Sequence, residues 1–307
     1  MNSHMIRKID LPERSNTEVP QEFSVQGDGV ELFGYRWAGK KTPLIFVHGT
    51  SFHARCWDQI IRYLPEYEVI AFDLRGHGRA ETPITDDLHT LYTGSNIALD
   101  LRIALENLNI TDAMGIGHSM GGHVVVSVQS ENADLFSSLL LIDPVMSVKA
   151  ISKQQNEMFN FVRKRRDEWS SPEEMINRFT QRFPHSQWEP KVLDDYVRYG
   201  LLPNDTNDGF QLACPPLVEA AIYESGDSDL RDEASLVQIP VHIMRAKLRD
   251  LSNPDEIFGF SPTDPEVVDW FSNATELYLP DANHFLPMEH PSFVADQIIK
   301  FHDRVYV

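Results

Sequence analysis

The sequence predicts an α/β fold, in which a mostly parallel central sheet carries helices on both faces and a helical cap is inserted after one strand. Three observations predict it. Short continuous apolar runs recur along the chain, and helical patterns separate them. The alternation stops over residues 146–238 and then resumes. Continuous apolar runs are typical of strands buried on both faces of a parallel sheet, and strand–helix alternation winds helices around such a sheet.

The expected sheet begins with a hairpin, because residues 22–26 and 30–37 flank the turn Gly-Asp-Gly. Six later apolar runs predict further strands at 43–50, 67–79, 112–119, 137–144, 239–246 and 275–284. Helical patterns fall at 54–64, 95–108, 121–136 and 291–305. The last helix opens with Pro291, which the first turn of a helix tolerates. We assign residues 1–145 and 239–307 to one core domain.

Residues 146–238 interrupt this alternation. Helical stretches occupy 153–169, 171–183, 190–201 and 215–225, with no clear strand. A helical insertion after one strand predicts a cap over the carboxyl edge of the sheet. The cap holds many aromatic residues: Phe159, Phe161, Trp169, Phe179, Phe183, Trp188, Tyr196 and Tyr199. We expect most of them to pack the cap onto the sheet and a few to line an apolar pocket. The basic run RKRR at 163–166 covers a whole helical turn, which favours a solvated face.

Composition narrows the function classes. The 307 residues are 42% hydrophobic, and 46 acidic against 27 basic residues give a formal charge of −19. Nucleic acids and anionic membranes need clustered lysine and arginine, so neither is expected as the main partner. The sequence has no long uncharged apolar run and no signal-peptide core, which predicts a soluble cytoplasmic protein. Cys56 and Cys214 lie far apart without zinc-site spacing, so no metal is expected.

The pentapeptide G-x-S-x-G at 117–121 lies between a predicted strand and a predicted helix. This pattern is typical of a nucleophile elbow, in which a sharp turn holds a serine at the edge of the sheet. Neighbouring backbones approach closely there, so only glycine fits beside Ser119. Gly115 and Gly117 also fit part of a dinucleotide-binding loop. The third glycine falls at 121 instead of 120, which disfavours that reading.

Five stretches occur in the order found in one fold family: FVHGTSFHARCWDQIIRYL, VIAFDLRGHGR, GIGHSMGG, LLLIDPV and LPDANHFLPMEHP. From about residue 22 to residue 305, the chain resembles the α/β-hydrolase fold family. It is most similar to the branch of capped esterases, lactonases and C–C bond hydrolases. The resemblance implies a serine-dependent hydrolase without a cofactor.

The resemblance also implies roles for individual residues. His284 matches the general base of the family, although Asn283 stands where relatives usually have glycine. The backbone N–H groups of Thr50, with Ser51 as the alternative, and of Met120 match the oxyanion hole. The remaining histidines are not expected to be catalytic: His48 and His118 belong to their structural motifs, His77 packs a loop, and His290 begins the last helix.

The acid that orients the base is predicted to be Asp250. Asp143 and Asp250 both follow predicted strands, and the fold family uses either place. Asp250 lies 34 residues before His284, with one helix and one strand between them, which favours neighbouring loops. Asp255 is a weaker third candidate.

Together these features predict a serine hydrolase that cleaves carboxylic esters of small, largely apolar substrates through an acyl-enzyme. A lactonase or a C–C bond hydrolase on the same triad is the alternative within this class. A small-molecule receptor that binds without turnover is the alternative from another class. Epoxide hydrolases and haloalkane dehalogenases resemble this fold, but they need aspartate where this chain has Ser119.

Overall fold

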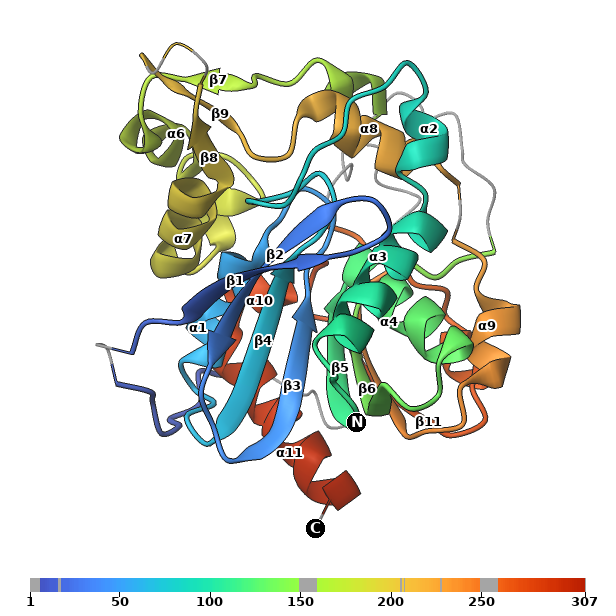
Figure 1. Ribbon diagram of the computed structural model, residues 1–307. Coiled ribbons are helices and arrows are strands. Elements are labelled where there is room, and N and C mark those ends of the chain that lie inside the picture. Colours follow the sequence, from blue (N-terminus) through green and yellow to red (C-terminus); the bar gives the residue numbers. More distant parts are fainter. Residues whose placement is uncertain are drawn as a thin grey trace.

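The computed structural model describes residues 6–15, 18–148, 159–204, 206, 208–226, 228–248 and 259–306. Its centre is an eight-stranded sheet in the order β1-β2-β4-β3-β5-β6-β10-β11 (Figure 1). The strands are β1 (Gln21–Gln26), β2 (Glu31–Trp37), β3 (Lys41–Val47), β4 (Tyr67–Asp73), β5 (Ala113–His118), β6 (Phe136–Ile142), β10 (Val241–Ala246) and β11 (Ala274–Leu279). Strand β2 pairs antiparallel with β1 and β4, and the other pairs are parallel. The predicted mostly parallel sheet is confirmed.

Helices cover both faces of the sheet (Figure 1). One face carries α3 (Gly94–Asn107), α4 (Met120–Glu131) and α9 (Arg231–Leu236), and the other carries α1 (Asp58–Ile61) and α11 (Pro291–Tyr306). Side chains of β3 alternate between the two cores: Ile45 and Val47 face α3 and α4, whereas Leu44 and Phe46 face α1 and α11. Every residue of β5 and β10 is buried, as continuous apolar runs predict.

Short elements connect these layers. They are the 3₁₀ turns η1 (Ala54–Trp57) and η3 (Val267–Trp270) and the single-turn helices α2 (Leu88–Leu91) and α10 (Leu286–Glu289). The helix expected over 54–64 is therefore split into η1 and α1, and the helix expected over 121–136 ends at Glu131. Within the described part of the chain, no helix has the length and apolar character needed to cross a membrane.

Most of the segment between β6 and β10 lies beyond the carboxyl ends of the parallel strands, whereas its last helix, α9, packs beside α4 on one face of the sheet (Figure 1). Its elements are β7 (Glu168–Trp169), α6 (Pro172–Phe179), η2 (His185–Gln187), α7 (Pro190–Gly200), β8 (Leu201–Pro203), β9 (Phe210–Leu212), α8 (Pro216–Glu224) and α9. Strands β7, β9 and β8 form a small antiparallel sheet, so the expectation of a strandless insertion is wrong. Strands of two or three residues are too short to carry the alternation that identifies a strand in a sequence.

The insertion is joined to the core by a third apolar cluster. Trp169, Trp188 and Tyr196 of the insertion are buried with Phe52 and Met288 of the core. Phe161 and Phe183, in contrast, are 64% and 53% exposed. Most aromatic residues of the insertion therefore pack inward, as expected. The boundaries drawn at 146 and 238 remain a prediction.

Candidate active site

Ser119 lies in the turn between β5 and α4 and has φ 55° and ψ −121°. A left-handed φ is costly for a residue with a side chain and persists only where the surroundings hold it. Here the N–H of Ser119 donates to the carbonyl of Ile142 at 3.1 Å, and its carbonyl accepts from Gly122 and Val145 at 3.0 Å each. The strained turn is therefore fixed by strand β6 and by the first turn of α4.

The glycines beside Ser119 are required by close backbone contacts. A Cβ on Gly117 would lie 2.3 Å from the carbonyl oxygen of Gly121. A Cβ on Gly121 would lie 2.0 Å from the carbonyl oxygen of Val47, at the end of β3. The steric reason for the G-x-S-x-G pattern is thus met in the structure.

His284 connects Ser119 to a buried carboxylate. The distance from its Nε2 to Ser119 Oγ is 3.0 Å, and the distance from its Nδ1 to Asp143 Oδ2 is 2.6 Å. In the arrangement that satisfies both contacts, Nδ1–H donates to Asp143 and Nε2 accepts from the Ser119 hydroxyl. The imidazole is 16% exposed, whereas the Asp143 side chain is fully buried. A hydroxyl, an imidazole and a carboxylate thus form one hydrogen-bonded chain.

The contact with Asp143 corrects our preference for Asp250 at this place. Strands β5 and β6 pair with His118 opposite Ile142, so Ser119 and Asp143 leave the sheet side by side. The other oxygen of Asp143, Oδ1, accepts from the N–H of Ala246 at 2.8 Å and from Ser261 Oγ at 2.6 Å. Asp250 and Asp255 lie outside the described residues. Distance along the chain misled the prediction, because pairing across the sheet decides which carboxylate reaches His284.

The loop after β3 lies directly against Ser119. A Cβ on Gly49 would be 2.9 Å from Ser119 Cβ, and Thr50 Oγ1 lies 3.4 Å from the sulfur of Met120. The N–H of Ser51 donates to His77 Nε2 at 3.1 Å and is therefore already engaged. This favours Thr50 over Ser51 as the partner of Met120 in binding an oxyanion, a role that remains a prediction.

Two other histidines hold the loops around the site. His48 Nδ1 contacts the carbonyl of Gly49 at 2.8 Å, and its Nε2 accepts from the N–H of Leu74 at 3.1 Å. His77 Nδ1 contacts the carbonyl of Arg75 at 2.9 Å. Burial lowers the pKa of His77 to about 4 and that of His48 well below its usual value, so both rings are neutral near pH 7. They organise loops, as the sequence predicted.

Aromatic rings form an apolar wall beside the imidazole. The ring of Phe285 lies 5.6 Å from that of His284, and Trp188 lies 5.7 Å from Phe285. Phe52 is 5.8 Å from Trp188 and 5.7 Å from Tyr196. Since Trp188 and Tyr196 belong to the insertion, the insertion supplies part of the apolar surroundings of the site.

The arginines of the RKRR run face different directions, as predicted, although the expected helical turn is not formed: the helix ends at Arg163, and residues 164–165 form a turn and a bend. Arg163 pairs with Glu224, Arg165 lies 2.9 Å from Glu219, and Arg166 pairs with Glu174. The Arg165 side chain is only 23% exposed and lines a small cavity together with Ser51, Tyr196 and Cys214. The expectation of a solvated face is therefore wrong for Arg165.

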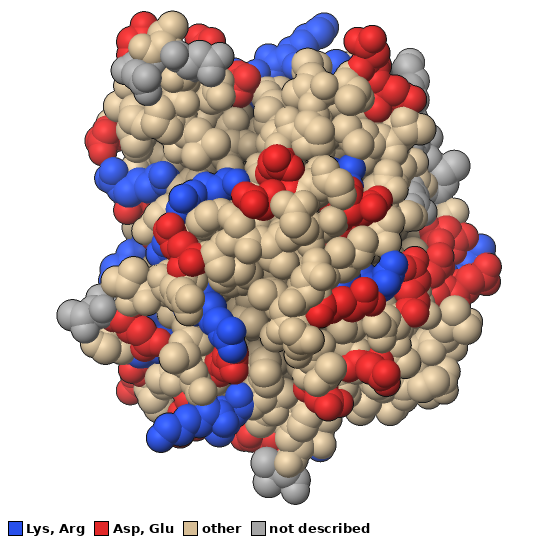
Figure 2. Space-filling view, in the orientation of Figure 1, with Lys and Arg blue, Asp and Glu red and all other residues tan. Residues whose placement is uncertain are grey.

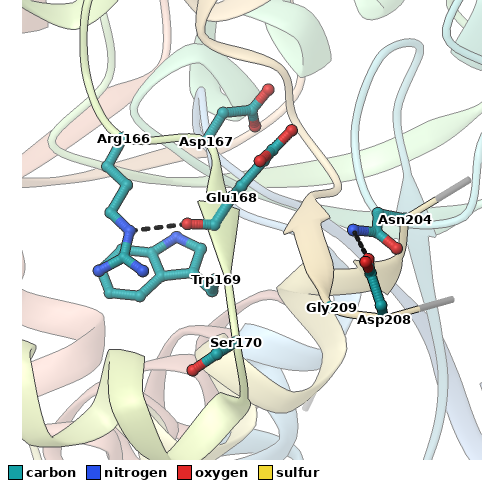
Figure 3. Close-up of a pocket in the computed structure, with 8 residues that line it drawn as sticks. All are labelled: Arg166, Asp167, Glu168, Trp169, Ser170, Asn204, Asp208 and Gly209. Atoms are coloured by element: carbon teal, nitrogen blue, oxygen red, sulfur yellow. Dashed lines mark hydrogen bonds between the residues drawn. The ribbon is translucent and has the colours of Figure 1, made fainter. Parts of the chain in front are cut away.

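A separate open groove lies within the insertion (Figure 3). It runs between residues 166–170 and the loop that carries Asn204, Asp208 and Gly209. Arg166 stacks on Trp169 there, with its guanidinium carbon 4.0 Å from the ring centre. Neither Ser119 nor His284 lines this groove.

A family model described as the alpha/beta hydrolase family matches residues 44–297. A soluble epoxide hydrolase of a Corynebacterium species is 27% identical to this chain, and the match covers 87% of the chain and 94% of that protein. Three other curated relatives are 32%, 34% and 33% identical, but this chain spans less than half of their length: 44%, 43% and 43%.

Two solved structures share the fold of this chain over nearly its whole length. The crystal structure of E-2-(acetamidomethylene)succinate hydrolase has a TM-score of 0.76 at 19% identity and covers 92% of this chain and 99% of its own. A thermophilic esterase from Thermogutta terrifontis, with malate bound, has a TM-score of 0.66 at 23% identity and covers 94% of this chain and 100% of its own. At these identities the likeness establishes the common fold.

Proposed function

This chain belongs to the alpha/beta hydrolase family, and from that premise we propose that it is a serine hydrolase that cleaves carboxylic esters of small, largely apolar substrates. The observation that carries the proposal is the hydrogen-bonded chain of Ser119, His284 and Asp143. A hydroxyl within 3.0 Å of an imidazole, which a buried carboxylate orients, is the arrangement that activates serine as a nucleophile.

In the proposed reaction, Ser119 Oγ attacks the ester carbonyl while its proton passes to His284 Nε2. The N–H groups of Thr50 and Met120 donate to the oxyanion that forms. Collapse of this intermediate breaks the bond to the alcohol, and His284 returns the proton to the departing oxygen. Water then attacks the acyl-enzyme with His284 as base, releasing the acid and restoring Ser119. Asp143 holds the imidazole in the required tautomer and stabilises its cationic form throughout.

The nucleophile separates this proposal from epoxide hydrolysis, the activity named for one relative. Opening an epoxide with a carboxylate gives an ester on the enzyme, which water can cleave. Opening it with Ser119 would give an ether, which an imidazole and water do not cleave. Esters, lactones and activated C–C bonds all pass through an acyl-serine. Lactonase and C–C hydrolase activities therefore remain the alternatives within this class.

The surroundings support apolar substrates. The wall of Phe52, Trp188 and Phe285 offers apolar surface beside the imidazole. Two arginines of the basic run, Arg163 and Arg166, are already paired with Glu224 and Glu174. A substrate carboxylate would have to displace these glutamates.

Replacing the nucleophile tests the proposal. Ser119→Ala keeps the Cβ and should keep the fold, but it should lower kcat for 4-nitrophenyl acetate and butyrate by roughly 10⁴–10⁶-fold. Steady-state rates, with the melting temperature as the control, measure this. Retention of more than a tenth of the activity would refute Ser119 as the nucleophile. A receptor would show at most one slow turnover per chain in the wild-type protein.

A panel of esters of graded chain length, with lactones and a free-carboxylate monoester, then defines the substrate class. We expect the highest kcat/KM for short or medium apolar acyl groups. A steep preference for the carboxylate monoester, lost in Arg163→Gln or Arg166→Gln, would overturn the apolar assignment.

A further inference from the structure

The residue before the nucleophile makes a contact that the proposed reaction does not yet use. His118 Nε2 lies 2.8 Å from the main-chain carbonyl oxygen of His284. A carbonyl can only accept, so this ring carries its proton on Nε2 and donates it. The bond joins the end of β5, next to Ser119, to the loop that carries the base.

The surroundings of His118 fix it in this form. The ring is fully buried, and its Nδ1 has no hydrogen-bond partner among the described residues. Phe52 and Trp57 contact it edge-on, at 5.9 Å and 6.4 Å between ring centres. Burial, and next the neighbouring His284, lower the pKa of His118 to about 3. The ring is therefore a neutral donor near pH 7.

The other contacts of His284 hold its amide nitrogen and its ring, which also lies 4.9 Å from the ring of His118 between ring centres. The N–H of His284 donates to the carbonyl of Gly259 at 3.0 Å, and the side chain contacts Asp143. These two contacts hold the amide nitrogen and the imidazole, whereas the carbonyl is held by His118. Loss of that donor would leave the His284 carbonyl without this partner and free the loop to shift.

We propose that His118 is a positioning residue, whose Nε2–H sets the distance between the imidazole of His284 and Ser119 by holding the main chain of the base. The inference rests on the proposed function, because it concerns the proton transfer between these two residues. A shift of about 1 Å in a reacting group can lower a rate about 100-fold. His118 should therefore affect kcat much more than KM.

The test is a matched pair of variants, His118→Gln and His118→Met. Both side chains are unbranched and similar in size, but only glutamine can place an N–H near the position of Nε2. We expect Gln to keep kcat within about threefold of the wild type and Met to lower it about 10–100-fold, with KM little changed in both. Equal activities in the two variants, or a loss confined to KM, would overturn the proposal.

A second measurement does not depend on how the variants fold. In the wild-type protein, ¹⁵N-resolved NMR of the histidine rings should show His118 as the neutral Nε2–H tautomer with a slowly exchanging proton. The opposite tautomer or a cationic ring near pH 7 would overturn the inference. If the wild-type protein cleaves no ester, lactone or activated C–C bond, the proposed function fails instead, and the NMR result still reports on the His118 bond.

Discussion

At the scale of single residues, the buried carboxylate of Asp143 forms hydrogen bonds both with the imidazole of His284 and with groups at and beyond the end of β10. Its Oδ2 faces His284, and its Oδ1 accepts from Ala246 and Ser261. Asp143 also has φ 44°, so its backbone is held in an unusual conformation at the end of β6. Because both oxygens already accept from donors, the carboxylate has no freedom to rotate without losing a hydrogen bond.

Asp143→Asn should lower kcat roughly 10²–10⁴-fold with little change in KM. The amide would present an NH₂ group either to Nδ1–H of His284 or to the N–H of Ala246, and both of these are donors. Asp250→Asn is the matched comparison and should leave kcat within about threefold of the wild type. Steady-state kinetics of both folded variants shows which of the two aspartates orients His284. A larger loss in Asp250→Asn would return the acid to the position that the sequence first favoured.

The sequence located Ser119 and the partner histidine because each lies in a local motif with its own steric logic. It did not locate the contact of Asp143, since two aspartates follow two strands and local pattern does not say which strand lies beside β5. His118 was assigned to structure and not to function for a similar reason. The motif around Ser119 accounts for His118 in the sequence, whereas the carbonyl that His118 binds belongs to His284, 166 positions away.

At the scale of elements, helix α7 of the insertion meets the start of α1 through polar groups. Gln59 donates to Asp195 at 2.7 Å, and Arg55 binds Asp58 next to this contact. Burial, and next the charge of Asp58, raise the pKa of Asp195 to about 7. Below about pH 7 the folded protein therefore favours the protonated form of Asp195, whereas an unfolded chain has an aspartate pKa of about 4.

This difference predicts a pH-dependent stability. A raised pKa in the folded state means that the fold loses stability as pH rises from about 4 to about 7 and gains it back on acidification. Asp195→Asn should remove that loss, so it should raise the melting temperature at pH 8 and change it little at pH 4. Differential scanning calorimetry at both values tests this.

Asp194→Asn is the control for this measurement. Asp194 lies on the same helix, with a 45% exposed side chain paired to Arg198, and its removal should not give a gain that grows with pH. An equal pH profile for the Asp194 and Asp195 variants would contradict the assignment of the effect to Asp195.

The elements of the core were predictable because each parallel strand is a continuous apolar run long enough to be recognised. Strand β5, expected over 112–119, spans Ala113–His118, and β10, expected over 239–246, spans Val241–Ala246. The insertion was less predictable. Its strands β7, β8 and β9 are set by pairing with one another and not by a periodic pattern of their own.

At the scale of the whole molecule, negative charge dominates. The formal charge is −19, and Figure 2 shows acidic and basic side chains interspersed over one face, with uncharged surface between them. Such an excess repels anions over a distance of about 30 Å at 0.01 M salt and only about 3 Å at 1 M.

The excess of negative charge should make the hydrolysis of charged substrates depend on salt concentration. For an anionic ester such as 4-nitrophenyl hemisuccinate, kcat/KM should rise about two- to tenfold between about 0.01 M and about 0.5 M sodium chloride, because salt screens the repulsion. For neutral 4-nitrophenyl acetate it should stay nearly constant. A fall for the anionic ester would point to a local cationic site that overrides the net charge.

The order of the strands in the sheet also affects how the chain folds during translation. The six strands from β1 to β6, and the elbow with Ser119, all come from the first half of the chain, whereas β10 pairs with the free side of β6 about 100 residues later. At 5–20 residues per second, translation leaves that side of β6 unpaired for roughly 5–20 seconds. An unpaired strand edge is a template for association with other chains, so the nascent protein is most exposed to aggregation in this interval. His284 follows β11, and a growing chain therefore carries Ser119 long before it carries His284.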